Sequence, residues 1–66
     1  MTKEERERAY KACCYDFFVQ VAKLQGHLAT TPVIFGYVEQ CTRKIDHIMP
    51  TLKRLMYESL AEDTHE

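Results

Sequence analysis

The chain has 66 residues, 45% of them hydrophobic, and nine basic against ten acidic side chains leave a formal net charge of −1. A chain this short makes one small domain, spanning residues 1–66, whose core rarely supplies more than about 3–5 kcal/mol without a disulfide, a metal or a second subunit. The charge is too weak and too scattered to indicate a nucleic-acid surface by itself, and it does not indicate a membrane surface either.

A first helix is predicted over about residues 2–28. Thr2 and Glu5 have the spacing of a capping box, in which the threonine hydroxyl accepts from the Glu5 amide while the Glu5 carboxylate reaches back. Apolar residues then recur every three or four positions, which is the spacing of a seam against a second helix. The seam residues are Tyr10, Cys14, Phe17, Val21, Leu24 and Leu28, and the polar residues expected on the opposite flank are Asp16, Gln20, Lys23 and His27.

A second helix is predicted over about residues 32–61, after a short connection around residues 29–31. Gly26 weakens the end of the first helix, and Thr31 then offers a cap. Pro32 follows it, and a proline at the first helical position loses no hydrogen bond. The seam of this second helix is formed by Ile34, Val38, Cys41, Ile45, Ile48, Leu52 and Leu55.

The register of the second seam continues through Pro50, which predicts one helix with a kink there. Proline removes the hydrogen bond to the carbonyl of Asp46 and clashes with that turn, so a break near Met49 is the alternative. The last residues, 62–66, form an acidic tail that is expected to fray.

Two helices of this length joined by a short loop must lie antiparallel, so the predicted fold is all-α, a single helical hairpin. More apolar residues remain than one hairpin hides: Tyr15, Phe18, Val19 and Ala22 form a second stripe on the first helix, and Phe35, Met49, Met56 and Leu60 extend the seam of the second. A homodimeric four-helix bundle with the stripe at Tyr15, Phe18, Val19 and Ala22 as the dimer interface is the economical solution. The alternatives are a wide seam in a monomer and a stripe kept for another protein.

Three cysteines are an odd number, two of them are adjacent, and no long apolar run precedes them, which favours reduced thiols in the cytoplasm over a secreted disulfide framework. No two cysteines have the spacing that closes a zinc chelate loop, so no metal and no cofactor is predicted. A Cys–His pair would also need an oxyanion site, which the sequence does not offer, so we expect no enzyme.

The leading functional hypothesis is a small protein-binding regulator of the phage or plasmid type, an inhibitor, adaptor or chaperone that docks as a helical dimer on a larger protein. Only the small size of the chain suggests this lineage, and no residue or motif indicates the host. Aromatic and methionine side chains are expected as the anchors, the methionines adapt to different partners, and the arginines supply charged contacts at the rim. The residues expected to bind the partner are Tyr37, Arg43, Met49, Arg54, Met56 and Tyr57.

The alternative hypothesis is a helical-hairpin dimer that binds RNA or DNA. Two basic pairs lie about three turns apart on the second helix, so a phosphate track is conceivable. These pairs are Arg43 with Lys44 and Lys53 with Arg54. Glu39, Asp46 and Glu58 are interleaved with them, which favours an ordinary solvated face of mixed charge.

Overall fold

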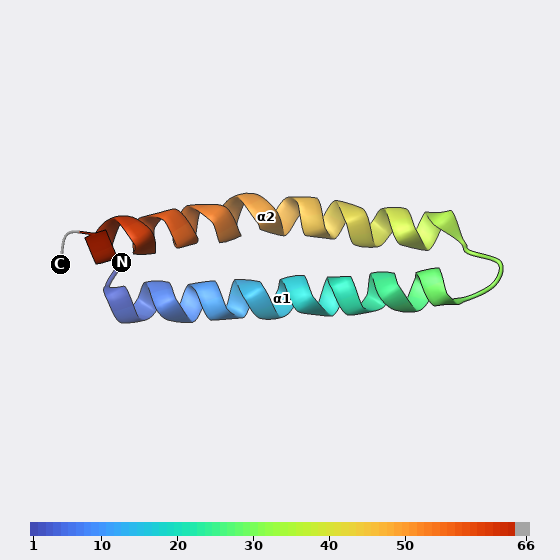
Figure 1. The fold of residues 1–66 in the computed structure, drawn as a ribbon, viewed down its shortest axis with the longest axis horizontal. Coiled ribbons are helices and arrows are strands. Elements are labelled where there is room, and N and C mark those ends of the chain that lie inside the picture. Colours follow the sequence, from blue (N-terminus) through green and yellow to red (C-terminus); the bar gives the residue numbers. More distant parts are fainter. Residues whose placement is uncertain (65–66) are drawn as a thin grey trace.

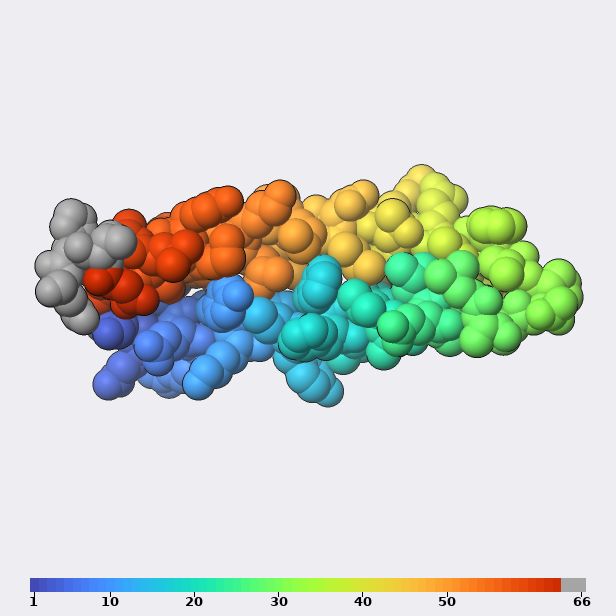
Figure 2. Space-filling model, viewed as in Figure 1, coloured from blue at the N-terminus to red at the C-terminus, as the bar shows by residue number. Residues whose placement is uncertain are grey.

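Residues 1–64 of the chain, described in a computed structural model, form an antiparallel hairpin of two α-helices, α1 (Lys3–Ala29) and α2 (Phe35–Thr64). The hairpin is a rod of 52 × 17 × 15 Å, with the start of α1 and the end of α2 at one end and the connection at the other (Figure 1). The space-filling view shows the side chains of the two helices in contact along the rod (Figure 2). The all-α hairpin predicted from the sequence is therefore confirmed.

The N-terminus of α1 is capped as the sequence predicts on the threonine side. The Glu5 amide donates to Thr2 Oγ1 at 3.1 Å, and the Arg6 amide donates to the Thr2 carbonyl at 2.9 Å. At the other end the Thr30 hydroxyl donates to the His27 carbonyl at 2.8 Å. These bonds satisfy backbone groups that a helix end otherwise leaves without partners.

α2 begins at Phe35, three residues later than Pro32, the predicted start. The Ile34 carbonyl accepts the first helical bonds, from the Tyr37 amide at 3.1 Å and the Val38 amide at 3.4 Å. Proline tolerates the first helical position without requiring it. Two packed helices lie about 8–10 Å apart, and the chain uses residues 30–34 to cross that gap.

α2 then runs without interruption through Pro50, so the predicted single helix is confirmed and a break near Met49 is wrong. Pro50 is exposed on the side of α2 that faces away from α1. The helix continues to Thr64, so the first part of the acidic tail is helical, and residues 65–66 lie outside the described residues.

The core is small. Among the described residues only Cys41 and Leu55, at 5% and 3% exposure, are fully buried, and both belong to the predicted seam of α2. Four further residues of that seam are half-buried: Val38, Ile45, Ile48 and Leu52. On α1 the half-buried members of the predicted seam are Tyr10, Cys14, Phe17, Val21 and Leu24. Ile34 and Leu28, at the connection, are exposed.

α1 is rotated about its axis relative to the prediction. Gln20 and His27, expected on the polar flank, are half-buried beside α2. The His27 ring stacks on Tyr37 with the ring centres 5.2 Å apart, and the Cys13 thiol lies 3.9 Å from the Ile48 carbonyl. The apolar stripe of α1 is wide enough to permit several rotations, and contact with α2 selects this one.

Candidate interaction surface

The two open sides of the hairpin differ in chemistry. Because successive helical residues point about 100° apart, one side collects the apolar residues that the seam leaves out. We call this side the apolar flank, and its members are Cys14, Phe18, Val21 and Leu28 on α1 with Phe35, Val38, Met49, Met56 and Leu60 on α2. Phe18 is 65% exposed and Phe35 is 73% exposed, so large aromatic side chains are accessible to solvent there.

The opposite side of the hairpin, the polar flank, is lined by polar and charged side chains. A shallow hollow on it is bordered by Asp16, Gln20, Arg43, Lys44, His47 and Ile48. Gln20 Oε1 is buried there without a hydrogen-bond partner among residues 1–64. Nearer the connection, the stacked rings of His27 and Tyr37 join the two helices on this flank. The hairpin therefore has one side lined mostly by polar and charged side chains and one side on which the exposed apolar side chains gather.

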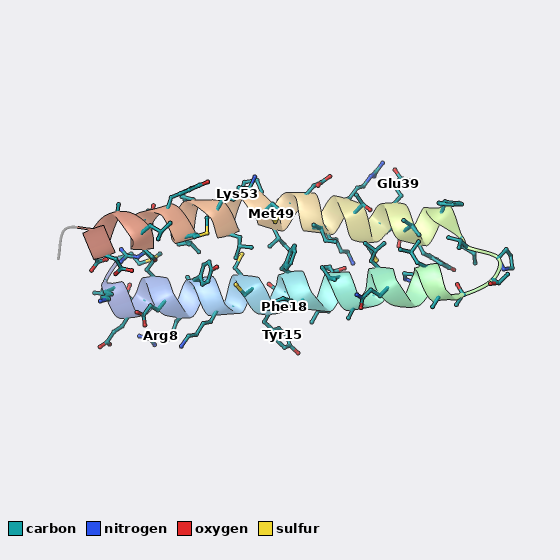
Figure 3. All side chains as sticks on the ribbon, viewed as in Figure 1. Arg8, Tyr15, Phe18, Glu39, Met49 and Lys53 are labelled. Atoms are coloured by element: carbon teal, nitrogen blue, oxygen red, sulfur yellow. The ribbon has the colours of Figure 1, made fainter. Side chains whose placement is uncertain are left out.

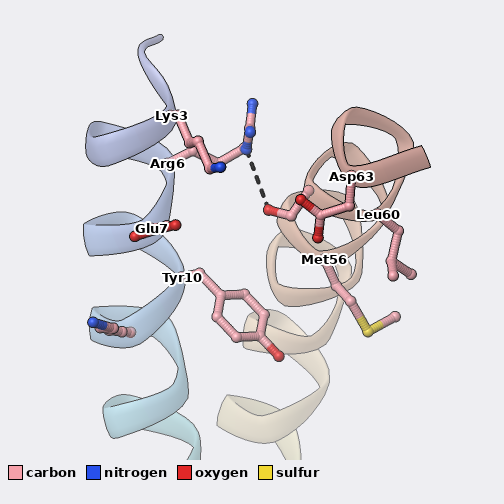
Figure 4. A pocket seen from close by; sticks show the side chains of 9 residues that line it. Lys3, Arg6, Glu7, Tyr10, Met56, Leu60 and Asp63 are labelled. Carbon is pink, nitrogen blue, oxygen red and sulfur yellow. Dashed lines mark hydrogen bonds between the residues drawn. The ribbon is translucent and has the colours of Figure 1, made fainter. Parts of the chain in front are cut away.

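A cavity of about 270 Å³ opens on the apolar flank at the end of the rod where the termini lie (Figure 4). Tyr10 reaches from α1 towards α2 in this view, beside Met56 and Leu60, which contribute apolar surface. The other lining residues are Lys3, Arg6, Glu7, Lys11, Ser59 and Asp63. The cavity thus has an apolar interior and a rim of mixed charge.

Arg6 forms one wall of the cavity and links the two helices. Its Nε donates to Ser59 Oγ at 3.2 Å, and its guanidinium forms an ion pair with Glu62. The Ser59 hydroxyl in turn donates to the Leu55 carbonyl at 2.9 Å. The Arg6 side chain is only 13% exposed, so this polar network holds the open end of the hairpin together from within.

Two ionisable groups near the cavity have raised pKa values. The pKa of Tyr10 is raised mainly by a side-chain hydrogen bond with Cys14, which favours the neutral phenol, and further by the charge of Cys14. The pKa of the Cys13 thiol is raised chiefly because burial disfavours the thiolate, with Cys14 and Asp16 adding to the effect. The thiolate form of Cys13, which is the reactive form, is therefore less favoured than that of an ordinary cysteine.

The residues predicted to form the dimer interface share the outer side of α1, because Tyr15, Phe18, Val19 and Ala22 have the i, i+3, i+4, i+7 spacing of one helix face. Tyr15 points away from α2 into solvent and is 70% exposed (Figure 3). Val19 and Ala22 also lie on the outer side of α1, where Val19 is half-buried. Phe18 is the one member of the predicted interface that belongs to the apolar flank.

The residues predicted to bind a partner divide among three surfaces. Met49 and Met56 lie half-buried on the apolar flank. Tyr37 lies on the polar flank, where its ring is engaged with His27. The remaining three share the outer side of α2 with Pro50, and we call this surface the outer stripe of α2: Arg43, Pro50, Arg54 and Tyr57.

The basic residues of the alternative hypothesis do not form one track. Lys53 lies towards the apolar flank, Lys44 towards the polar flank, and Arg54 on the outer stripe, because their positions are spread around the helix. Arg43 forms an ion pair with Glu39 at 2.7 Å, which neutralises one of the four cations.

The chain exposes more surface than a compact protein of its mass. Its accessible surface is 5269 Å². A compact monomer of 7.8 kDa would expose about 4,400 Å², so the hairpin exposes roughly 900 Å² more. The hairpin exposes this additional surface because it is elongated and each helix covers only one side of the other.

The sequence assigned Tyr10 and Leu28 to the seam and named Phe35 and Leu60 only as extra stripe residues, so the cavity and its surroundings were missed. Spacings of three and four residues fit both sides of a wide stripe, which is why the pattern does not separate a seam from a flank.

Comparison with protein families, with characterised proteins and with solved structures finds no match to this chain. Within residues 1–64, neither helix is long and apolar enough to cross a membrane. Among the same residues, no three His, Cys, Asp or Glu side chains form a group that could hold a metal ion.

Proposed function

We propose that the protein is a non-enzymatic protein-interaction module that works as a homodimer in the cytoplasm. Two hairpins bury their apolar flanks against each other as a four-helix bundle, and the outer surfaces dock on a larger protein as an inhibitor, adaptor or chaperone. The observation that carries this proposal is the apolar flank, on which large side chains such as Phe18 and Phe35 are mostly exposed. Burying them in a second copy removes that apolar area from water.

The amount of surface supports a second copy as the occupant. Stable protein interfaces bury about 800 Å² on each partner. The hairpin exposes roughly 900 Å² more than a compact monomer of its mass, which is the area that one such interface would remove. With so few buried residues, a second subunit also provides the additional core that a chain of this length needs.

The outer stripe of α2 is proposed as the surface that docks on the larger protein. Tyr57 is exposed there, and Arg43 and Arg54 are exposed beside it. Tyrosine is among the residue types that most often carry binding energy, and the two arginines supply charged contacts at the rim. Pro50 lies between them on the same side, and we propose that it bends α2 and shapes this surface.

A cytoplasmic location is part of the proposal. All three cysteines, Cys13, Cys14 and Cys41, are free thiols. Free thiols persist in compartments that keep them reduced.

The dimer is tested by sedimentation equilibrium at micromolar concentration. We expect a mass about twice the 7.8 kDa of one chain. Phe18→Glu should give the monomer mass, because it places a charge in the buried flank. Tyr15→Glu is the matched control and should remain dimeric, since Tyr15 is about as exposed as Phe18 but points away from α2. A monomeric wild-type protein would refute the dimer.

The docking surface is tested with a partner identified by affinity capture, using variants of the outer stripe. Tyr57→Ala should weaken binding by about 1–3 kcal/mol, while Arg43→Ala and Arg54→Ala each cost less and act partly through the association rate. Binding is measured at two salt concentrations. Dominant arginine effects, each lowering the salt slope by about one, would favour nucleic-acid binding instead.

A further inference from the structure

The cavity at the open end of the hairpin has the size and lining to receive an aromatic side chain. A cavity of roughly 150 Å³ lined by apolar groups already accommodates a benzene ring. This cavity measures about 270 Å³, and Tyr10, Met56 and Leu60 contribute apolar surface to it. Its natural occupant is therefore a large apolar group brought from elsewhere.

Phe35 is the most exposed aromatic residue among residues 1–64, at 73% exposure. It is the first residue of α2, so it lies at the connection, whereas the cavity lies beside the termini at the far end of a rod 52 Å long. Phe35 therefore does not reach the cavity of its own chain.

A two-fold axis beside Phe18 that relates two copies of the chain would bring Phe35 of one copy to the cavity of the other. His27 stacks on Tyr37, so Leu28 and Phe35 lie level with each other at the connection. At 1.5 Å per residue, Phe18 lies about 15 Å from the level of Leu28. In the other direction it lies about 12–17 Å from the level of the cavity residues Tyr10 and Glu7. The exposed ring and the cavity are thus nearly equidistant from Phe18 along the apolar flank.

We propose, building on the dimer proposed above, that the cavity of each hairpin receives Phe35 of a second copy. The two hairpins then pack antiparallel with their connections at opposite ends, and Phe18 meets its equivalent at the two-fold axis. One contact is made twice, as an isologous interface requires. A parallel dimer, with both connections at one end, would set Phe35 against Phe35 and leave both cavities unfilled.

The charges favour the same arrangement. The cavity rim carries Lys3, Glu7, Lys11 and Asp63. Residues 24–38, which include the connection, contain no Asp, Glu, Lys or Arg. An antiparallel dimer places this uncharged segment over the rim, whereas a parallel dimer would bring two charged rims together and cost desolvation of both.

The proposal is tested by a double-mutant cycle on the dimer dissociation constant, using Phe35→Ala, Met56→Ala and the double variant. Each single change should raise the dissociation constant about tenfold or more. The double variant should raise it by clearly less than the product of the two, because each change removes the same contact. Phe35 and Met56 lie about 30 Å apart along α2 at 1.5 Å per residue, too far to touch within one chain, so such coupling arises between copies. Ile34→Ala, exposed beside Phe35, is the control and should show no coupling with Met56→Ala.

Photo-crosslinking gives an independent measurement. With p-benzoylphenylalanine in place of Phe35 and a mixture of light and heavy isotope-labelled chains, the crosslink between copies should map to residues 3–11 or 56–63. A crosslink to residues 28–38, or multiplicative effects in the cycle, would overturn the antiparallel arrangement while leaving the dimer intact. A wild-type chain that sediments as a monomer would refute the dimer and this proposal together.

Discussion

Tyr10 and Cys13 are both held in their neutral forms by their surroundings. The hydrogen bond with Cys14 acts on Tyr10, and burial acts on Cys13. In each case the folded chain holds the proton more tightly than the unfolded chain does. Their contribution to stability is therefore fully present below the ordinary pKa values and is lost as the pH rises through the raised ones.

The free energy of unfolding should accordingly fall as the pH rises above the ordinary pKa values, 9.0 for Cys13 and 10.0 for Tyr10. Urea unfolding between pH 8 and 11 measures it. Tyr10→Phe removes one of the two titrating groups and should show a smaller fall over the same range. Equal slopes for the variant and the wild type would show that Tyr10 does not contribute.

Arg6 and Arg43 are a matched pair of arginines in different surroundings. Arg6→Ala should lower the free energy of unfolding by about 1–3 kcal/mol, because it removes the bond to Ser59 and the ion pair with Glu62 from a nearly buried site. Glu62 is 36% exposed, so solvent screening keeps its share of this loss small. Arg43→Ala breaks only the exposed pair with Glu39 and should change stability by less than about 0.5 kcal/mol. Urea unfolding measures both, and equal losses would contradict the network.

At the scale of the helix, Pro50 is the residue that departs most from helical chemistry. α2 continues through it, so the Asp46 carbonyl receives no backbone bond from position 50. Pro50→Ala restores that donor and should leave the fold intact or raise the free energy of unfolding by up to about 3 kcal/mol. Thermal unfolding followed by circular dichroism measures it. A marked loss of stability would mean that the proline stabilises α2 at this position.

The spacing of apolar residues predicted the buried face of α2 better than that of α1. The predicted seam of α2 contains both fully buried residues, Cys41 and Leu55, because the apolar residues of α2 gather on one side of the helix. On α1 the stretch from Cys13 to Phe18 is apolar on several sides, so the spacing fits more than one rotation. Gln20 and His27 lie beside the seam because of how α1 packs against α2. The spacing of apolar residues along α1 does not contain that information.

The candidate surface was predicted in part. Phe18 and the methionines Met49 and Met56 were named from their spacing and lie on the apolar flank. Tyr37 was placed with them but lies across the hairpin, because its partner His27 follows the unexpected rotation of α1. The cavity depends on residues at opposite ends of the chain, such as Tyr10 and Leu60, and no local pattern indicates such a site.

At the scale of the whole molecule, stability should depend on concentration. A hairpin with two fully buried residues among those described has little core of its own, and a second copy that binds only the folded state adds stability by mass action. The melting temperature should therefore rise with protein concentration between about 1 and 100 μM. Phe18→Glu should melt at a lower temperature that does not change with concentration. A wild-type melting temperature that is constant over this range would contradict the dimer.

The antiparallel layout also sets an order of events along the rod. The stacked rings of His27 and Tyr37 are close in the chain, whereas Arg6 and Ser59 are 53 residues apart. The entropy lost on closing a loop grows with its length, so contacts near the connection form at the lowest cost and those at the termini form last. The hairpin should then zip from its connection outwards. Backbone amides of the two helices should exchange with deuterium fastest beside the termini and progressively more slowly towards the helix ends at the connection.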